Sequence, residues 1–340
     1  MKKIISIFIC LSLFCAGAFA DDTDNSRGKI SGAMESILDD LGLYLPENSS
    51  LLGNQPDAYI GKLFPSKPCH LAAGFSVSAT LMDTSDLSQA VQDFQDGITE
   101  KLNNKGAADS FSIDCPVPSK IPLPSAAFAV RLGGIVLPID IGAYGVSTFN
   151  IIDDLSFKDF SADFNYSTFG FDVRYSVCED KKLMPEVSFG AGYIYSNIST
   201  DFGLTAEYPV KSTYTGYTGD ENARLNSSIS LDSINHTLFA SVQCSKKILI
   251  FEPYIGIKGF MTQTTSKYDW SYESYLGDNK DDNLSDKDSK DVTHDFGHNM
   301  SAQVFGGLGL QIKYFQLALN GAYNLTNNKV SASVGFNFKM

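Results

Sequence analysis

Two groupings of residues in this 340-residue chain could carry chemistry. His294, Asp295 and His298 lie close together in the acidic stretch 264–298, and such a group could bind a metal ion or act as the acid–histidine pair of a hydrolase. Because these histidines reproduce no catalytic or ligand motif, we expect no catalytic residue, no metal site and no cofactor. The second grouping consists of charged residues that interrupt otherwise uncharged segments: Arg131, Asp140, Asp172, Arg174, Glu186, Glu252 and Lys258.

The acidic stretch itself indicates a solvated external loop. It contains nine acidic residues and four lysines, and it lacks the glycine and terminal glutamate register of a calcium-binding EF-hand loop. The whole chain has a formal net charge of -13. A surface this acidic repels phosphates, which excludes nucleic acid as the main partner.

Most of the chain alternates between apolar and polar residues with a period of two. From Val330 to Met340 every even-numbered residue is apolar, and every odd-numbered residue is polar or glycine. Successive side chains of a strand point to opposite faces, so such a segment has one apolar and one polar face. Segments of about 10 residues with this pattern suit strands that cross a bilayer at a tilt. We expect ten strands, at 69–82, 124–133, 136–149, 166–178, 185–198, 227–244, 247–263, 299–313, 314–325 and 329–340.

The connections between these segments predict how the strands are arranged. Short connections alternate with long ones, and only the short connection 326–328 breaks the alternation. Short turns at one end and long loops at the other are typical of outer-membrane barrels. The predicted fold class is therefore all-β, an antiparallel transmembrane β-barrel of about ten strands. The long connections, expected outside the membrane, are 83–123, 150–165, 199–226 and 264–298.

Hairpin pairing supports the same arrangement. Residues that face each other across a hairpin must point to the same side of the sheet. Three expected pairs satisfy this condition: Ile312 with Phe315, Leu325 with Val330, and Cys244 with Leu249.

A soluble β-sandwich or a lipocalin-like barrel would alternate in the same way, with the apolar face inward. Two features favour the membrane. The polar faces are rich in Gly, Ser, Asn and Gln rather than in long charged side chains. The apolar faces carry aromatic residues near the strand ends, as a lipid-headgroup girdle would. These are Tyr175, Phe251, Phe315 and Phe338 at one rim, and Phe169, Tyr195 and Tyr323 at the other.

The N-terminal residues indicate export. Lys2 and Lys3 precede the apolar stretch 4–14, and Ala18-Phe19-Ala20 provides small residues for cleavage after Ala20. We therefore expect a signal peptide at 1–20, a periplasmic or plug segment at 21–68, and the outer-membrane barrel at 69–340.

Two amphipathic helices are predicted outside the strands. Apolar residues recur at helical spacing in 29–45, within the N-terminal segment, and in 86–102, within the first long external loop. Both are expected to pack against the barrel or its mouth. The alternative is a hatch and a lid around a hydrophobic ligand.

The interrupting charges are expected to face the barrel lumen. Arg131 and Arg174 each lie between apolar neighbours, so each guanidinium should point to the polar face. A ten-stranded barrel is narrow, and buried charges need partners. We expect Arg131 and Arg174 to pair with acids such as Asp140, Asp172 or Glu252. The alternative is a polar constriction, to which Lys258 would also contribute, that selects small solutes.

The whole mature chain resembles bacterial outer-membrane β-barrel proteins as a class. Its end, Gly-Phe-Asn-Phe-Lys-Met at 335–340, is similar to the C-terminal signal that the barrel-assembly machinery recognises, although Phe338 lies two places before the end. The expected hatch and lid resemble the fatty-acid transporter family, which has more strands. The acid and histidine residues of 294–298 are of the kind that ten-stranded outer-membrane proteases place near their rim, without any protease motif. The class resemblance implies the outer membrane as location, with its lipids and the assembly machinery as partners.

The expected function is that of a surface barrel without catalysis. It would be either a narrow channel that carries a small solute or hydrophobic ligand, or a structural barrel. The alternatives are an adhesin that acts through its long acidic loops and, third, a hydrolase at the rim.

Cell fractionation tests the membrane assignment. We expect the protein in the outer-membrane fraction, and we expect its gel mobility to change on heating, because a closed barrel resists detergent until it is heated. Recovery from the soluble periplasmic fraction without detergent would contradict the barrel.

Overall fold

A computed structural model describes residues 47, 49–61, 70–83, 120–133, 137–147, 160–178, 184–209, 222–276, 279–326 and 328–339. The predicted signal peptide and the predicted helices at 29–45 and 86–102 lie outside these residues. Within them, no helix is both long and apolar enough to cross a membrane.

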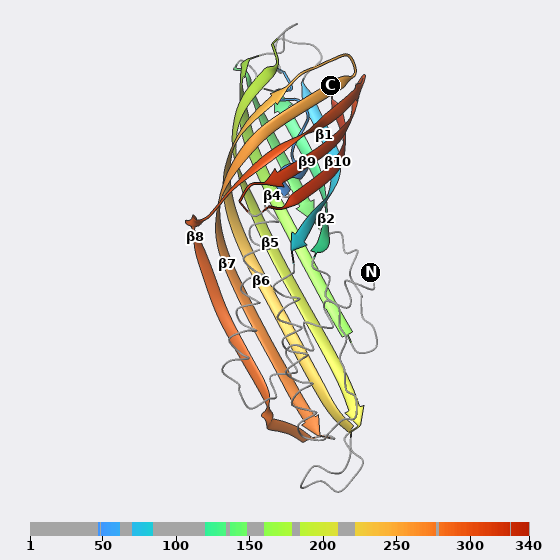
Figure 1. Ribbon diagram of the computed structural model, residues 1–340, viewed down its shortest axis with the longest axis vertical. Coiled ribbons are helices and arrows are strands. Elements are labelled where there is room, and N and C mark those ends of the chain that lie inside the picture. Colours follow the sequence, from blue (N-terminus) through green and yellow to red (C-terminus); the bar gives the residue numbers. More distant parts are fainter. Residues whose placement is uncertain are drawn as a thin grey trace.

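The described strands close into one barrel in which each strand pairs antiparallel with its chain neighbour, as predicted (Figure 1). Strand β1 completes the ring by pairing with β10, from Ala72 opposite Lys339 to Thr80 opposite Ser331. Closure gives every strand two neighbours, which removes the unpaired sheet edges that a bilayer cannot hydrate. The strands are β1 (Leu71–Asp83), β2 (Lys120–Gly133), β3 (Ile139–Ser147), β4 (Phe160–Cys178), β5 (Glu186–Pro209), β6 (Asn222–Ser245), β7 (Phe251–Leu276), β8 (Asn279–Ile312), β9 (Phe315–Asn324) and β10 (Val330–Lys339).

The outer face of the barrel is apolar and the inner face is polar. Along β9, exposed residues alternate strictly with buried ones: Leu319 is 44% exposed, whereas Gln316 is 0% exposed. A lipocalin-like barrel would have the opposite polarity, so the facing matches a membrane barrel. Most of the predicted rim aromatics lie exposed on the outer face: Phe169, Tyr175, Phe251, Phe315, Tyr323 and Phe338.

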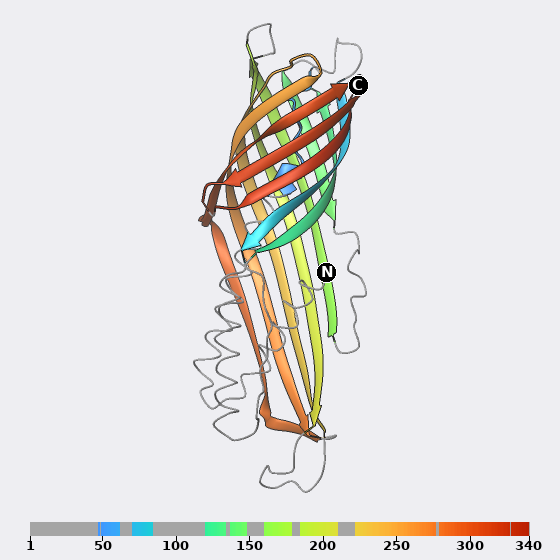
Figure 2. The ribbon, with the colours of Figure 1, turned by 45° about the vertical axis from the view of Figure 1, so that its right-hand side comes forward.

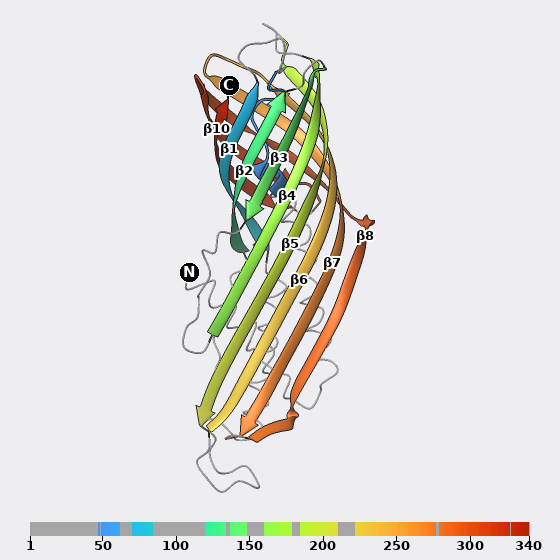
Figure 3. The ribbon, with the colours of Figure 1, turned by 180° about the vertical axis from the view of Figure 1, so that it is seen from behind.

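The barrel wall is much taller on one side than on the other. Strands β4 to β8 continue far past the ends of β1–β3, β9 and β10 (Figures 1 and 3). The predicted loops 199–226 and 264–298 were therefore too long, because β5 and β6 reach Pro209 and Asn222, and β7 and β8 reach Leu276 and Asn279. In these extensions the two-residue alternation continues on β6 and β7 with the opposite facing: Leu231 and Tyr268 are buried, whereas Asp232 and Lys267 are exposed.

The hairpin predictions had mixed outcomes. Ile312 does pair with Phe315. The other two pairs were wrong, because Cys244 pairs with Ile255 and Val330 pairs with Tyr323. In both cases the connection is longer than expected, and Leu249 lies within a turn at φ 58°. Turn length is set by backbone dihedrals at a few residues, which the apolar pattern does not report.

The facing can be tested with a charge on either side of the wall. We expect Leu319→Arg to impair assembly, since it directs a charge toward lipid near the middle of β9 at a cost of about 2–4 kcal/mol. Gln311→Arg on the inner face of β8 should be tolerated much better. The measurement is the fraction of heat-modifiable protein in the outer membrane, and equal damage from both changes would contradict the facing.

Candidate functional site: a plugged lumen

A segment from the N-terminal side of the barrel fills its lumen. We call Glu47 and residues 49–61 the plug; Figure 2 shows it inside the ring of strands. The plug begins with a short helix that ends at Leu52 and continues without regular structure. Leu51 is fully buried and packs in a cluster with Tyr254, Phe305 and Ala322 of the inner wall. Its packing makes the lumen a filled interior rather than an open tube in this structure.

Inward-facing polar side chains hold the backbone of the plug. An irregular buried segment cannot satisfy its own N–H and C=O groups, so the wall has to do so. The Gln243 amide donates to the carbonyl oxygens of Gln55 and Pro56 at 2.9 and 3.0 Å. The Ser245 hydroxyl accepts from the N–H of Ala58 at 2.9 Å, and the Ser76 hydroxyl donates to the carbonyl of Leu52 at 2.9 Å.

Close approach between plug and wall depends on a missing side chain. Tyr144 of β3 is buried with its ring against Gly53 of the plug. A Cβ at Gly53 would lie only 2.5 Å from that ring. Glycine is therefore required where the plug crosses β3.

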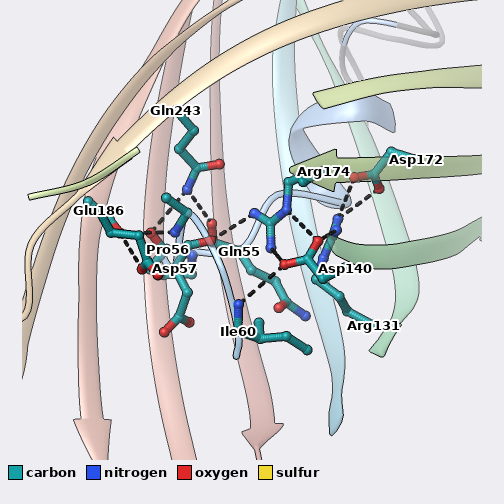
Figure 4. A network of polar contacts seen from close by, with 12 residues as sticks. Gln55, Pro56, Asp57, Ile60, Arg131, Asp140, Asp172, Arg174, Glu186 and Gln243 are labelled. Atoms are coloured by element: carbon teal, nitrogen blue, oxygen red, sulfur yellow. Dashed lines mark hydrogen bonds and ion pairs between the residues drawn. The ribbon is translucent and has the colours of Figure 1, made fainter. Parts of the chain in front are cut away.

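Two arginines and two aspartates form a buried cluster across β2, β3 and β4 (Figure 4). Arg131 donates to Asp140 at 2.6 Å and to both oxygens of Asp172 at 2.7 and 2.8 Å. Arg174 forms a bidentate pair with Asp140, at 2.8 Å for both bonds. Gly142 lies between the partners, and its lack of a Cβ leaves room for Arg131 to reach Asp172.

The same cluster is connected to the plug. Arg174 directs its third donor, Nη1, to the carbonyl of Asp57 at 2.7 Å, and Asp140 accepts from the N–H of Ile60 at 3.2 Å. Charged donors in a low-dielectric lumen bind such acceptors strongly. The wall cluster and the plug therefore stabilise each other.

A second charged cluster surrounds the side chain of Asp57. Its carboxylate lies 3.0 Å from the ammonium of Lys247, accepts a bond from Lys339, and lies 3.2 Å from the amide nitrogen of Gln316. Burial disfavours the charged carboxylate, but Lys339 and Lys247 outweigh this effect and hold the pKa of Asp57 below its usual range. Burial also lowers the pKa of Lys247, and Asp57 and Glu252 more than reverse this, so it lies above the usual range.

Further along the lumen, two more charges meet the plug. The Lys258 ammonium donates to the carbonyl and hydroxyl of Ser50, at 3.1 and 2.6 Å, and to the side-chain oxygen of Asn54 at 2.5 Å. The carboxylate of Glu47 accepts bonds from Ser301 and Asn324. Both ends of the plug are thus tied to the wall.

All the predicted lumen residues are buried on the inner face: Arg131, Asp140, Asp172, Arg174, Glu186, Glu252 and Lys258. The structure brings the two arginines together with Asp140 and Asp172, as expected, but not with Glu252. Instead Glu252 lies 4.0 Å from Lys247 and accepts from Gln316 at 3.1 Å. The sequence reasoning missed Asp57 and Lys247, because they lie in the plug and in a turn, where no alternation identifies a lumen position. It also left out Lys339, although the alternation of β10 places this residue on the polar face.

Of the histidine grouping, the structure describes the side chains of His294 and Asp295. Residues 295–298 bulge from the ladder between the paired positions His294 and Asn299, and Asp295 is exposed whereas His294 is half-buried. The side chain of His298 lies outside the described atoms. In the described part of the chain, no three His, Cys, Asp or Glu side chains are grouped as metal ligands.

No family model and no curated protein sequence matches the chain. Among solved structures, the outer-membrane protease OmpT of Escherichia coli is similar at 11% identity and a TM-score of 0.41, over 81% of this chain and 98% of that one. The translocator domain of the autotransporter NalP of Neisseria meningitidis matches at 7% identity and 0.33, over 91% and 98%. A FadL homologue of Pseudomonas aeruginosa matches at 8% and 0.29, over 89% and 96%.

The chain is an outer-membrane β-barrel. The closed ring with an apolar outer face gives this class directly. The neighbours share the architecture alone, and they carry no argument about the function of this protein.

Loss of one arginine tests whether the buried cluster is dry. We expect Arg174→Ala to lower the free energy of unfolding by about 3–5 kcal/mol, because Asp140 would keep only one of its two guanidinium partners. The matched control is Lys267→Ala, which breaks an exposed pair with Asp269 and should leave the urea midpoint in detergent unchanged. A loss for Arg174→Ala no larger than that of the control would mean that the lumen charges are hydrated.

Proposed function

We propose that this outer-membrane barrel is held shut by its own N-terminal segment and serves as a non-catalytic surface protein. The observation that supports this is the plug, which is bonded to strands around the whole ring. The wall residues that bond to it include Ser76 on β1, Asp140 on β3, Arg174 on β4, Gln243 on β6, Lys258 on β7, Ser301 on β8, Asn324 on β9 and Lys339 on β10. Contacts on so many sides favour a stable closed state over a permanently open pore.

A second role, binding of a partner at the cell surface, is favoured by the tall wall of β4–β8. This wall continues beyond the apolar band, and its outer face there is polar and acidic. Exposed acids on it include Asp201, Asp232, Asp291 and Asp295. In this role the barrel anchors the wall, and the wall makes the contact.

Export and assembly complete the proposal. The N-terminal pattern Lys2-Lys3, 4–14 and Ala18-Phe19-Ala20 supports a signal peptide that is cleaved after Ala20. The apolar outer face would contact outer-membrane lipids, and β10 would be the strand read by the barrel-assembly machinery.

Planar-bilayer recordings with a lock on the plug test the closed state. A Cβ added at Gly309 would lie 2.8 Å from the Cβ of Pro56. The double variant Pro56→Cys, Gly309→Cys can therefore form a disulfide after the two backbones move apart by about 1 Å. We expect the native protein to show no steady current. The oxidised double variant should also carry no current, even when further substitutions weaken the contacts between the plug and the wall. Reduction should restore the behaviour of the unlocked protein.

The single variants Pro56→Cys and Gly309→Cys serve as controls for the packing change. A steady current through the native protein that persists in the oxidised double variant would overturn the proposal, because ions would then pass with the plug fixed in place.

A further inference from the structure

The Asp57 carboxylate marks an anion-binding position in the barrel wall. Three groups of the wall converge on it: the ammonium groups of Lys247 and Lys339 and the amide of Gln316. They come from the β6–β7 turn, the end of β10 and the start of β9, so β-barrel closure rather than local sequence brings them together. Two cations and a neutral donor around one carboxylate are the chemistry of an oxyanion site.

This position is at the mouth of the barrel that carries the short turns. The side chain of Lys247 is half exposed, whereas the Asp57 carboxylate is fully buried. An anion that arrives at this mouth would therefore meet Lys247 first. The plug supplies the anion in the closed state.

Lys258 provides a second cationic position deeper in the lumen. Within the described part of the chain, the polar contacts of its ammonium are oxygens of Ser50 and Asn54, both in the plug. The rings of Phe239 and Phe305 each lie 5.2 Å from the ammonium, and the charges of Asp172, Arg131 and Arg174 also act on it. Rings attract a cation without neutralising it, so the charge stays available to an anion.

The acids of the wall do not cancel these cations. Asp140 and Asp172 are already paired with Arg131 and Arg174. Glu252 lies 3.9 Å from Lys339 and 4.0 Å from Lys247, so one carboxylate is shared by two ammonium groups. Glu186 bonds weakly to Ser245 at 3.5 Å near the same mouth. Three lysines, Lys247, Lys339 and Lys258, against Glu252 and Glu186 leave the path positive by one formal charge.

We propose that withdrawal of the plug opens a path for small anions, with carboxylate-bearing solutes as the favoured class. Lys247, Lys339 and Gln316 bind the anion at the mouth, and Lys258 receives it further along. The inference rests on the proposed function, in that Asp57 acts as the internal carboxylate that a solute replaces. Fixed cations in a low-dielectric channel raise the local anion concentration and exclude cations.

The test uses the full chain with a weakened plug. Asp57→Asn removes the internal carboxylate with little change of shape, and Leu51→Ala removes the plug side chain from the Tyr254–Phe305 cluster. This opening variant leaves every wall charge in place. Its current is recorded in a planar bilayer across a potassium chloride gradient and then across a potassium acetate gradient, with folding checked by heat-modifiable gel mobility.

We expect the reversal potential of the opening variant to show preference for chloride and acetate over potassium. Adding Lys258→Gln should lower the anion-to-cation permeability ratio on the order of threefold, which corresponds to about half a kT of potential at the lumen wall, because anion and cation respond with opposite sign. Lys313→Gln is the matched control: it removes the same charge from an exposed turn, and it should leave the ratio unchanged.

The outcomes separate this inference from the closed-state proposal. Cation preference, no preference, or equal effects of Lys258→Gln and Lys313→Gln would overturn the anion path while leaving the plug intact as a finding. A folded opening variant that never conducts would also overturn it. Current through the oxidised Pro56→Cys, Gly309→Cys protein would instead overturn the plug.

Discussion

The guanidinium of Arg174 connects the two parts of this molecule. It binds Asp140 of the wall through two bonds and the carbonyl of Asp57 through a third. A charge inside a narrow barrel is stable only when almost every donor has an acceptor, and the wall alone provides acceptors for two of its groups. The plug backbone provides the third acceptor, the carbonyl of Asp57. The lumen charges and the plug are therefore one network, and removing either leaves polar groups of the other without partners.

This network explains why a plug of irregular backbone is tolerated at membrane depth. Non-helical backbone is excluded from lipid, but it is allowed where protein surrounds it. The inner faces of the strands provide side-chain amides and hydroxyls that bond to the backbone of the plug. The amide of Gln243 bonds to a plug carbonyl, and the hydroxyl of Ser245 bonds to a plug N–H group. A lumen lined by apolar residues could not hold the same segment.

The uneven height of the wall has a different cause. All ten strands cross the apolar band, because a bilayer requires a closed ring of backbone hydrogen bonds. Beyond the band, water satisfies backbone groups, so closure is no longer required and β4–β8 continue without β9, β10 and β1–β3. The ten-stranded ring is thus adapted to lipid, and the projecting part of β4–β8 is adapted to water. This division allows a filled lumen and a projecting wall to coexist in one chain.

The sequence by itself determined the class of fold and the facing of the lumen charges. Side-chain direction in a strand depends only on the next residues along the chain, so alternation around Arg131 and Arg174 sufficed to place them inward. It also named Asp140, Asp172 and Glu252 as candidate partners, of which only the two aspartates pair with the arginines. It did not predict the full length of β8, because charged residues stand on both faces of 279–298 and leave no apolar pattern. On β7 a pattern was present but missed, since Tyr268 and Trp270 alternate with Asp269 and Ser271. Only the tertiary structure decided that Asp57 meets Lys247 and Lys339, since these residues lie far apart in the chain and are joined by barrel closure and by the path of the plug. Local patterns encode the face of a strand, whereas contacts between distant segments depend on register and closure, which no single segment contains.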